Sequence, residues 1–582
     1  MKLDFKLLYR IALWISILGI IAFISDFGFS QSNFSQRLLD GFYFIVLGVG
    51  IISTFARYFR NSQLIRRKVF VFDLFSICFT LWIFYLYLFV GVPFETDQLL
   101  ENPIWVRIAV VFTFIREFSE VKFNYKRTLL DPAQLFIASF LFIILFGAFL
   151  LMLPNATYSG ISFMDALFTS TSAVCVTGLI VVDTGSYFTE FGQVIIMALI
   201  QVGGLGILTF ASYFSYFFKG GSTYENQLAI SDMTSSKKLS EVFSTLKYII
   251  LITFVIELFS GILIYASLEA EQFQSQYDQI FFSVFHAISA FCNAGFSTLS
   301  NSLYDVGFKY NYVLQLTIIG TFVLGGLGFP IVVNIINYVK YLFRKLISFG
   351  KNNVGYRPWV LNLNSRITLI TTFSITAIAF AAFFALEYDN TLAEHDGFGK
   401  VVTALFGATT PRTAGFNTID TAAMLFPTTM MVFLLMWIGA SPASTGGGIK
   451  TSTFAIATLN LLSLAKGKTR IEIFKREIAD ISVRRSFAII SLSLIVIGFG
   501  IMLISIFDRE KDLMDIGFEC FSAYSTVGLS LGITASLSKM SKFIIIVIMF
   551  VGRVSMLTII IAIFKKVKSK NYRYPTEEIT IN

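Results

Sequence analysis

Four short glycine-containing segments recur along the chain, and their residue types suit the binding of a partly dehydrated cation. Their glycines are Gly178, Gly295, Gly415 and Gly528, at intervals of 117, 120 and 113 residues. Glycine accepts backbone angles that turn successive carbonyl oxygens toward one axis, and rings of such oxygens replace the water around an ion in selective pores. Four copies at near-constant spacing predict one pore built from four loops, although a single membrane glycine equally well serves close helix packing.

Each glycine segment has the surroundings of a re-entrant loop. A serine or threonine precedes each glycine by six positions, and these residues are Ser172, Ser289, Thr409 and Ser522. The segments before the glycines run near 161–174, 279–291, 398–409 and 514–525. At about 1.5 Å per residue they are too short to cross a bilayer as helices. Because irregular backbone at membrane depth must line a cavity or be buried in protein, we predict a half-membrane helix and an ion-binding loop in each copy.

The composition is that of a polytopic membrane protein. Of 582 residues, 55% are hydrophobic and only 14% are charged, and the mean hydropathy is +0.74. Soluble domains carry about 25% charged residues. The net charge of +9 comes from basic residues in short loops, which is the positive-inside pattern, so it does not predict binding of nucleic acid. The four cysteines and two histidines lack the spacing of metal ligands, so we expect no such metal site.

Apolar runs predict twelve membrane crossings. The first four lie near 10–29, 37–58, 69–92 and 103–120. The others form pairs of an outer helix (M1) and an inner helix (M2) around each loop: 134–153 with 190–216, 247–268 with 311–343, 366–387 with 426–462, and 486–507 with 541–564. The basic loops all fall on one side if the N-terminus is cytoplasmic. We therefore predict a multi-pass protein of the cytoplasmic (inner) membrane, with both termini inside and all four loops opening outside.

The predicted fold is an all-α integral membrane protein. It has four parallel repeats of M1, pore helix, filter and M2 around a pseudo-fourfold pore, preceded by four additional transmembrane helices. The expected boundaries are 1–130 for the N-terminal four-helix region, 131–220, 221–345 and 346–465 for three pore repeats, and 466–582 for the fourth repeat with a short cytosolic tail. Each repeat begins and ends inside, so the repeats are related by an axis along the membrane normal.

The loops and two further stretches resemble the Trk/Ktr/HKT superfamily of potassium transporters over about 131–570. The stretches are Leu-Leu-Met-Leu-Pro-Asn-Ala-Thr at 150–157 and Gln-Val-Gly-Gly-Leu-Gly at 201–206. The resemblance implies K⁺ uptake through a channel-like pore without catalytic residues. The positions that match the family's ion-binding filter are Val176, Thr177, Gly178, Asn293, Ala294, Gly295, Thr413, Ala414, Gly415, Thr526, Val527 and Gly528. Some Na⁺-carrying relatives have serine at the first filter glycine, so Gly178 favours K⁺.

A second unusual segment, 438–450, interrupts the third M2 run. Its proline and three consecutive glycines cannot continue a stable helix. A packing kink is the alternative, but the segment is longer than a kink needs. The resemblance implies an intramembrane gate below the filter, and the candidate gate residues are Ser441, Pro442, Ser444, Thr445, Gly446, Gly447, Gly448 and Lys450. Lys450 reaches either the pore or the cytosol.

Arg553 lies inside the last apolar run. A guanidinium at this depth costs several kcal/mol unless it faces water or a partner. The resemblance aligns it with an arginine below the filter, where its charge would raise the barrier for cations. Snorkelling to the surface is the alternative, but about ten apolar residues follow before Lys565.

The resemblance also implies partners, namely a second copy of the chain in a homodimer and a cytosolic ring of nucleotide-binding regulatory subunits. The chain has no glycine-rich phosphate loop after a strand, so we expect no cofactor in this chain, K⁺ as the transported ion, and any nucleotide on the regulatory partner. Basic residues on the predicted cytosolic face offer a docking surface, although positive-inside topology explains them equally well. They are Lys237, Lys238, Arg344, Lys345, Lys466, Arg484 and Arg485.

The first 130 residues carry a weaker signal. Asp73 in the third span and Arg107 and Arg116 in the fourth resemble the charged helices of voltage-sensor domains. Each charge moved across the membrane supplies about 2.3 kcal/mol per 100 mV, so two arginines supply little. A structural or assembly role is therefore favoured for this region.

Other functions compete with K⁺ uptake. A Na⁺-permeable or Na⁺-coupled transporter of the same superfamily is the nearest alternative. A twelve-span carrier of organic solutes would show twofold repeats and charged groups at mid-membrane, whereas the repeats here are fourfold and the loops nearly uncharged. A membrane enzyme would need a cluster of histidines, cysteines or carboxylates at one depth, and no such cluster is visible in the sequence.

Overall fold

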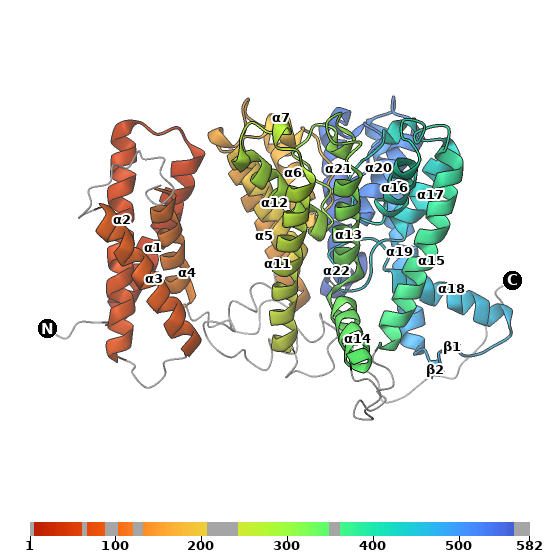
Figure 1. The fold of residues 1–582 in the computed structure, drawn as a ribbon, viewed down its shortest axis with the longest axis horizontal. Coiled ribbons are helices and arrows are strands. Elements are labelled where there is room, and N and C mark those ends of the chain that lie inside the picture. Colours follow the sequence, from red (N-terminus) through yellow and green to blue (C-terminus); the bar gives the residue numbers. More distant parts are fainter. Residues whose placement is uncertain are drawn as a thin grey trace.

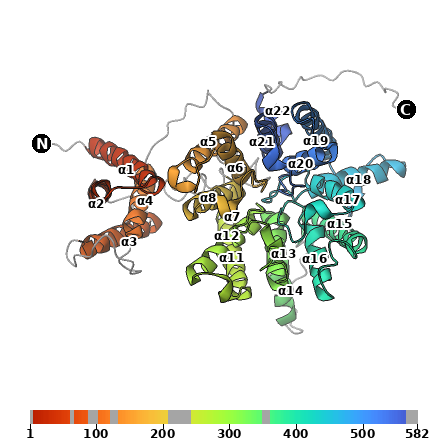
Figure 2. The same cartoon turned by 90° about the horizontal axis from the view of Figure 1, so that it is seen from above.

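The computed structural model describes residues 5–60, 67–87, 103–119, 132–206, 242–347 and 361–563, and these are almost entirely helical. Four helices open the chain and stand together on one side of the molecule (Figures 1 and 2). They are α1 (Phe5–Gly28), α2 (Asn33–Arg60), α3 (Arg67–Tyr85) and α4 (Ile104–Ser119). A short hairpin of β1 (Glu472–Ile473) and β2 (Arg476–Glu477) follows later in the chain.

The rest of the described chain repeats one unit four times, as the sequence predicted. The M1 helices are α5 (Pro132–Leu151), α11 (Val242–Ser267), α15 (Leu363–Glu387) and α19 (Asp480–Phe507). The pore helices are α6 (Phe163–Cys175), α12 (Gln276–Cys292), α16 (Phe398–Thr409) and α20 (Leu513–Ser525). The M2 segments begin with α8 (Glu190–Leu205), α13 (Tyr312–Leu327), α17 (Phe426–Trp437) and α21 (Lys539–Val554). Seen from above, the four units surround a common centre (Figure 2).

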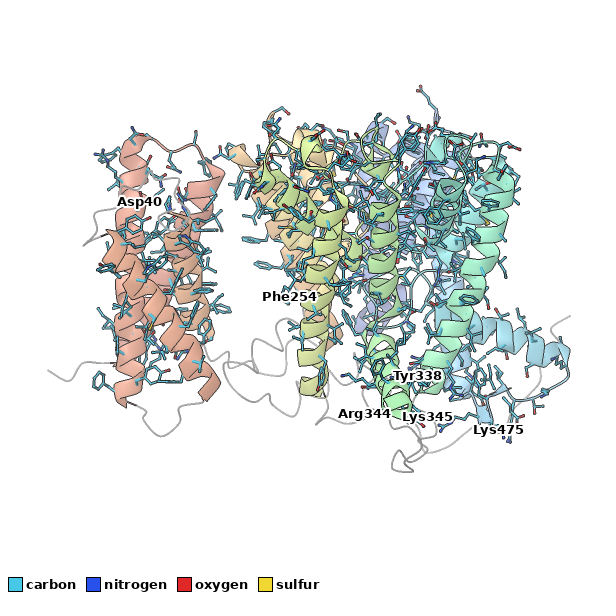
Figure 3. All side chains as sticks on the ribbon, viewed as in Figure 1. Asp40, Phe254, Tyr338, Arg344, Lys345 and Lys475 are labelled. Atoms are coloured by element: carbon cyan, nitrogen blue, oxygen red, sulfur yellow. The ribbon has the colours of Figure 1, made fainter. Side chains whose placement is uncertain are left out.

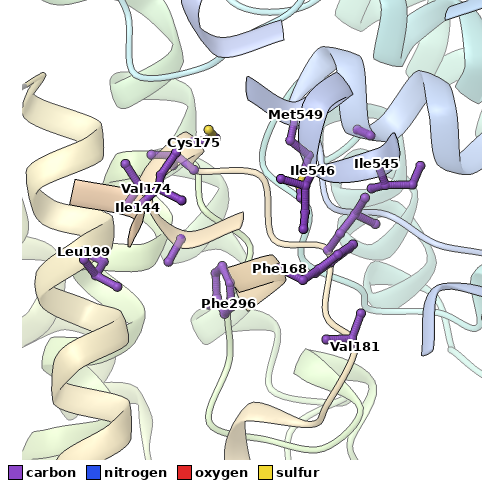
Figure 4. Close-up of a cluster of buried hydrophobic side chains, with 14 of the residues drawn as sticks. Ile144, Phe168, Val174, Cys175, Val181, Leu199, Phe296, Ile545, Ile546 and Met549 are labelled. Carbon is purple, nitrogen blue, oxygen red and sulfur yellow. The ribbon is translucent and has the colours of Figure 1, made fainter. Parts of the chain in front are cut away.

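The packing of the helices closes this ring. The first half of each M2 packs against the pore helix of the next repeat: α8 against α12, α13 against α16, α17 against α20, and α21 against α6. Figure 4 shows one such junction, where Phe168 of α6 and Ile546 of α21 belong to the same buried apolar cluster as Phe296 from the second repeat. Each repeat therefore depends on both neighbours for its core, so the four repeats form one pore unit.

The M2 segments of the second, third and fourth repeats are interrupted at their middle, which the sequence predicted only for the third repeat. The break lies at Gly328 (φ 82°) in the second repeat and at Ser555 (φ 74°) in the fourth, and the described part of the first M2 ends at Gly206 (φ 78°). Positive φ cannot continue a right-handed helix. After the breaks come α14 (Phe329–Ile347), bent by 107° from α13, and α22 (Met556–Ile563). The expected single spans 311–343 and 541–564 are therefore wrong in this respect, and 207–216 lies outside the described residues.

In the third repeat the interruption is a loop of thirteen residues, 438–450, before α18 (Thr451–Ala465). By length and composition, five described helices can each cross a membrane, and the bent pair α13–α14 makes a sixth if it is one span. The other predicted crossings are shorter apolar helices, broken pairs or segments that extend beyond the described residues. The total of twelve crossings therefore stays a prediction.

Three basic residues labelled in Figure 3 mark one end of the molecule. Arg344, Lys345 and Lys475 lie at the lower end of the molecule, whereas the pore helices occupy its upper half (Figures 1 and 3). This arrangement agrees with basic residues on the cytosolic side and loops that open outside. Lys237 and Lys238 lie outside the described residues.

Among the described residues, three ion pairs with buried carboxylates hold the N-terminal bundle together. Arg107 Nε lies 2.8 Å from an oxygen of Asp26, and Arg116 Nε lies 2.6 Å from an oxygen of Asp73. Arg57 pairs with Glu117. Both arginines of α4 are thus matched by carboxylates of other helices, which suits a fixed bundle. The bundle touches the first pore repeat, because Asn155 Nδ2 donates to Phe27 O at 3.0 Å.

We expect Asp73→Asn to destabilise the bundle, because it removes the carboxylate partner of Arg116 inside the membrane. Breaking a buried ion pair on one side costs about 3–5 kcal/mol. Thermal unfolding of the purified protein measures the loss, and Asp73→Asn with Arg116→Gln should restore part of it. A voltage-dependent change in ion flux at unchanged stability would instead favour a sensor role.

Candidate functional site

The site begins where the pore helices end. The residue that follows three of these helices adopts a left-handed conformation: Val176 (φ 57°), Asn293 (φ 59°) and Thr526 (φ 51°). Thr413 (φ 78°) occupies this place in the third repeat. The negative ends of four helix dipoles, each equivalent to roughly half an elementary charge, are thereby directed to the segments that follow. Such ends favour a cation.

Two residues further on, the four glycines also have positive φ, with values of 89° at Gly178, 68° at Gly295, 79° at Gly415 and 93° at Gly528. They meet in a closed ring, because each glycine lies against the carbonyl that precedes the glycine of the next repeat. A Cβ atom on Gly178 would lie 2.3 Å from Ala294 O, and one on Gly295 would lie 2.8 Å from Ala414 O. A Cβ on Gly415 would lie 2.1 Å from Val527 O, and one on Gly528 would lie 2.3 Å from Thr177 O. Thus no side chain fits at any of the four positions.

Hydroxyl groups from the pore helices support the loops. Ser172 Oγ and Ser522 Oγ each accept a hydrogen bond from the backbone N–H of their glycine at 3.1 Å. Ser289 Oγ donates to Phe296 O at 2.7 Å. In the third repeat Thr410, and not Thr409, makes the matching contact, to Phe416 O at 2.7 Å. The third loop is therefore one residue shorter than the others, and Thr409 instead bonds carbonyls of its own helix.

Above the ring lies an open vestibule of about 500 Å³. All four glycines line it, together with backbone and hydroxyl groups from every repeat. Two carboxylates, Asp183 and Asp420, are among the lining residues. Carboxylates at the mouth of a low-dielectric passage raise the local concentration of cations.

An ion pair closes part of the rim between the second and third repeats. Lys309 Nζ lies 3.1 Å from Glu394 Oε2, and Tyr304 Oη donates to the same carboxylate at 3.2 Å. The hydrogen bond between Lys309 and Glu394 lowers the pKa of Glu394 and raises the pKa of Lys309. Both groups therefore remain charged at neutral pH, and Tyr304 joins this pair to the vestibule wall.

Below the ring lies the loop 438–450. A Cβ atom on Gly446 would lie 2.1 Å from Thr413 Oγ1, and one on Gly447 would lie 2.3 Å from Thr526 Oγ1. Thr445 Oγ1 donates to Asn293 Oδ1 at 3.2 Å. The loop thus lies directly against the filter segments of the second, third and fourth repeats. Its Ala443 O accepts from Phe329 N at 3.3 Å, at the M2 break of the second repeat.

Two basic side chains hold this loop. Lys450 Nζ donates to Gly446 O at 2.6 Å. Arg553 donates to Thr445 O, and its second terminal nitrogen donates to Gly203 O at 2.5 Å. Arg553 therefore links the fourth repeat to the third and the first at one level below the filter. Neither cation has a carboxylate partner among the ion pairs of the described residues.

This architecture has counterparts among known proteins. A family model described as TrkH, cation transport protein, matches residues 101–574. The chain belongs to this family. Because the family is one of transporters, the prediction that the chain is not an enzyme is confirmed.

Several relatives extend the match over most of the chain. Ktr system potassium uptake protein B of Bacillus subtilis (strain 168) is 36% identical over 450 residues, covering 77% of this chain and 96% of that protein. Potassium/sodium uptake protein NtpJ of Enterococcus hirae is 33% identical over 463 residues, covering 78% of this chain and 98% of that protein. The crystal structure of the potassium transporter TrkH from Vibrio parahaemolyticus shares the fold, with a TM-score of 0.60 and 17% identity over 85% of this chain and 97% of that one.

In this TrkH-family chain the structure brings all twelve predicted filter residues into the segments around the ring. The predicted gate residues share one loop, in which Ser444 Oγ donates to Ser441 O at 2.6 Å and Pro442 O lies against Gly328. The Lys450 side chain is directed to this loop, and its predicted reach to the pore or to the cytosol stays a prediction. The stretch at 201–206 provides Gly203, whose close approach to Val174 O brings α8 against the first pore helix.

Sequence reasoning missed several polar groups at membrane depth. Arg412 in the third loop donates to Gly439 O at 3.4 Å. Glu257 of α11 accepts from Gln201 Nε2 at 3.2 Å. His286 and Glu519 lie fully buried in two pore helices. The signal that could have found them is an ionisable residue inside an apolar segment. Within the described ranges, no group of three or more His, Cys, Asp or Glu side chains is suited to a metal ion.

Proposed function

We propose that this protein takes up K⁺ across the cytoplasmic membrane through the pore at the centre of its four repeats. The observation that carries the proposal is the closed ring in which each glycine lies against the carbonyl of the next repeat. Carbonyls held at fixed distances by neighbouring backbone replace the hydration shell of an ion. The names of the relatives at 33–36% identity, a potassium uptake protein and a potassium/sodium uptake protein, support the same substrate.

The test is growth of a K⁺-uptake-deficient bacterium at low K⁺, with and without a candidate cytosolic partner. Expression of the wild-type chain should restore growth, and a variant with a filter substitution should not. Uptake of K⁺ and Na⁺ measured in the same cells gives the ion preference. Failure of the well-expressed wild-type chain to restore growth with any candidate partner would contradict the proposal.

Na⁺ permeation is the second candidate. The relative named as a potassium/sodium uptake protein favours it, whereas glycine at position 178 favours K⁺ within the resemblance. Equal uptake of the two ions would decide for this alternative. Membership in a family of cation transport proteins leaves the organic-solute carrier without support.

For the ion site, we propose the carbonyls of the filter residues named from the sequence, 176–178, 293–295, 413–415 and 526–528. Their positive-φ positions and the ring contacts support this assignment. For the gate, we propose the loop from Ser441 to Lys450, because it lies against three filter segments from below. Arg553 serves as the electrostatic barrier and as a tether, since it donates to this loop. K⁺ is the only ion assigned to the filter.

For the chain as a whole, we propose the division into 1–130 and four pore repeats with the boundaries given above, and both termini in the cytoplasm. The N-terminal bundle has a structural role, which its internally matched ion pairs support. The membrane partner is a second copy of the chain in a homodimer.

The cytosolic partner is a ring of nucleotide-binding regulatory subunits that docks on the basic face. Arg344, Lys345, Arg484 and Arg485 are exposed there. We expect the purified chain to bind neither ATP nor NAD in calorimetric titrations. Replacing these four residues with glutamine should weaken binding of the regulatory subunits. It should not change the ion preference of the pore, because these residues lie far from the filter.

The matched control for docking is Arg509→Gln, which removes an exposed charge between α19 and α20 at the opposite end of the pore unit. It should leave binding of the regulatory subunits intact. Tight nucleotide binding to the isolated chain, or equal loss of regulatory-subunit binding in both variants, would count against the assignment.

A further inference from the structure

Two pore helices carry a buried ionisable side chain at the same position, and the contacts between the filter glycines do not account for them. His286 of α12 and Glu519 of α20 each stand nine residues before the glycine of their repeat. Both are fully buried. Each contacts the serine two residues after its glycine, Ser297 in the second repeat and Ser530 in the fourth.

The hydrogen bonds of His286 fix its tautomer. Nδ1 lies 2.9 Å from Phe282 O, and since a carbonyl only accepts, Nδ1 carries the proton. In the neutral ring Nε2 is then an acceptor, and Ser297 Oγ donates to it at 2.9 Å. Ser297 Oγ in turn accepts from Leu299 N at 3.0 Å. These hydrogen bonds connect the segment that follows the filter glycine to the pore helix.

Glu519 repeats this geometry with different chemistry. Its Oε1 accepts from Ser530 Oγ and from Thr534 Oγ1, the latter at 3.0 Å. Ser530 Oγ accepts from Gly532 N at 2.9 Å, as Ser297 does from the residue two positions on. In both repeats, therefore, the pore helix supplies an acceptor, and a serine of the vestibule wall donates to it.

The other two repeats lack this tether. In the first, the equivalent pair is Thr169, whose hydroxyl donates to Asp165 O of its own helix at 2.9 Å, and Ile180, which has no polar side-chain atom. In the third repeat, whose loop is one residue shorter, the position equivalent to His286 and Glu519 is Gly407. The ring contacts run from repeat one to two, three, four and back to one. The filter segments of the second and fourth repeats, which carry this contact, therefore face each other across the pore.

We propose that His286 and Glu519 are positioning residues that hold the filter segments of two opposite repeats and thereby set the ion preference of the pore. The inference rests on the proposed function. Neither side chain lines the pore; each acts through its serine, which lies two residues beyond the filter glycine. Discrimination between K⁺ and Na⁺ depends on where the filter carbonyls are held. A filter segment that has lost its hydrogen bond to the pore helix therefore binds K⁺ less tightly.

The experiment compares full-length variants in a K⁺-uptake-deficient bacterium, with KM, maximal rate and K⁺/Na⁺ uptake ratio measured separately. Ser297→Ala and Ser530→Ala remove only a hydroxyl from the vestibule wall, so they should fold. Loss of a buried hydrogen bond should raise the KM for K⁺ roughly fivefold or more and lower the K⁺/Na⁺ ratio. Glu519→Gln keeps the Oε1 acceptor and should behave as the wild type, whereas Glu519→Leu should match or exceed Ser530→Ala.

Thr169→Val is the matched control, because it removes a hydroxyl at the same position of the first repeat that bonds only its own helix. It should leave KM and ion ratio unchanged. Wild-type values in both serine variants, or an equal shift in Thr169→Val, would overturn the inference. A wild-type chain without K⁺ uptake would instead overturn the proposed function, so the two failures are distinguishable.

Discussion

Gly415→Ser should lower the K⁺/Na⁺ uptake ratio at least about tenfold, which corresponds to about 1.4 kcal/mol of differential ion binding. The Cβ atom of the serine would lie 2.1 Å from Val527 O, so the carbonyl of the fourth repeat must move. Because the four repeats form a closed ring, displacement of one carbonyl disturbs the next. Substitution of any of the other three filter glycines should have the same direction of effect, and parallel uptake assays with K⁺ and Na⁺ measure it.

The control separates steric exclusion from backbone strain. Gly160 also has positive φ, at 77°, but no atom lies within 4 Å of the Cβ position in its loop. Gly160→Ser therefore introduces left-handed strain of about 1–2 kcal/mol without a clash in the ring. It should leave the ion ratio unchanged. If all four filter variants kept the wild-type ratio, the ring would not be the site of ion selection.

The spacing of the four glycines was enough to predict the repeats, the pore helices and the ring, because each needs a special local conformation that few residue types allow. Two M2 helix ends were also visible in principle, since Gly206 and Gly328 end helices with positive φ. The break at Ser555 was not, because a serine with φ of 74° is imposed by tertiary contacts and not by its own preference. The predicted continuous span 541–564 failed for that reason, whereas 311–343 failed because the signal of Gly328 was not used.

The hydrogen bonds around the filter were harder to foresee. The offset of six residues correctly selected Ser172, Ser289 and Ser522, but in the third repeat the contact is made by Thr410. A shift of one residue depends on how the helix ends, which side-chain spacing does not reveal. His286 alone in an apolar helix is typical of a packed core residue. Only its alignment with Glu519 and the two serines in space indicates a shared role.

The basic residues show the same division. Arg553 was recognised by its position in an apolar run, yet its two carbonyl partners belong to segments that lie 108 and 350 residues away. Likewise, the sequence showed Arg107 and Arg116 inside an apolar run, but their partners Asp26 and Asp73 come from other helices and were found only in the structure. Sequence predicts that a buried charge needs a partner, and the fold decides which one.

Deletion of Gly446–Gly448 should increase K⁺ flux and weaken its regulation. These glycines bring the loop against Thr413 and Thr526 from below, where no side chain fits. Lys450 and Arg553 hold two loop carbonyls in this position. A hydrogen bond to a charged group contributes about 1.5–3 kcal/mol, so Lys450→Met alone should shift the closed–open equilibrium roughly ten- to a hundredfold toward open.

Flux through the purified protein in vesicles, with the ion ratio measured alongside, separates a gate from a filter defect. Both variants should raise flux while the K⁺/Na⁺ ratio stays near that of the wild type, because the ring itself is unaltered. Lys468→Met is the control, since it removes an exposed lysine just after α18. It should change neither flux nor ratio. A fall in flux with folded protein would mean that the loop supports the pore and does not close it, because a blocking segment cannot be removed without opening the path that it occupies.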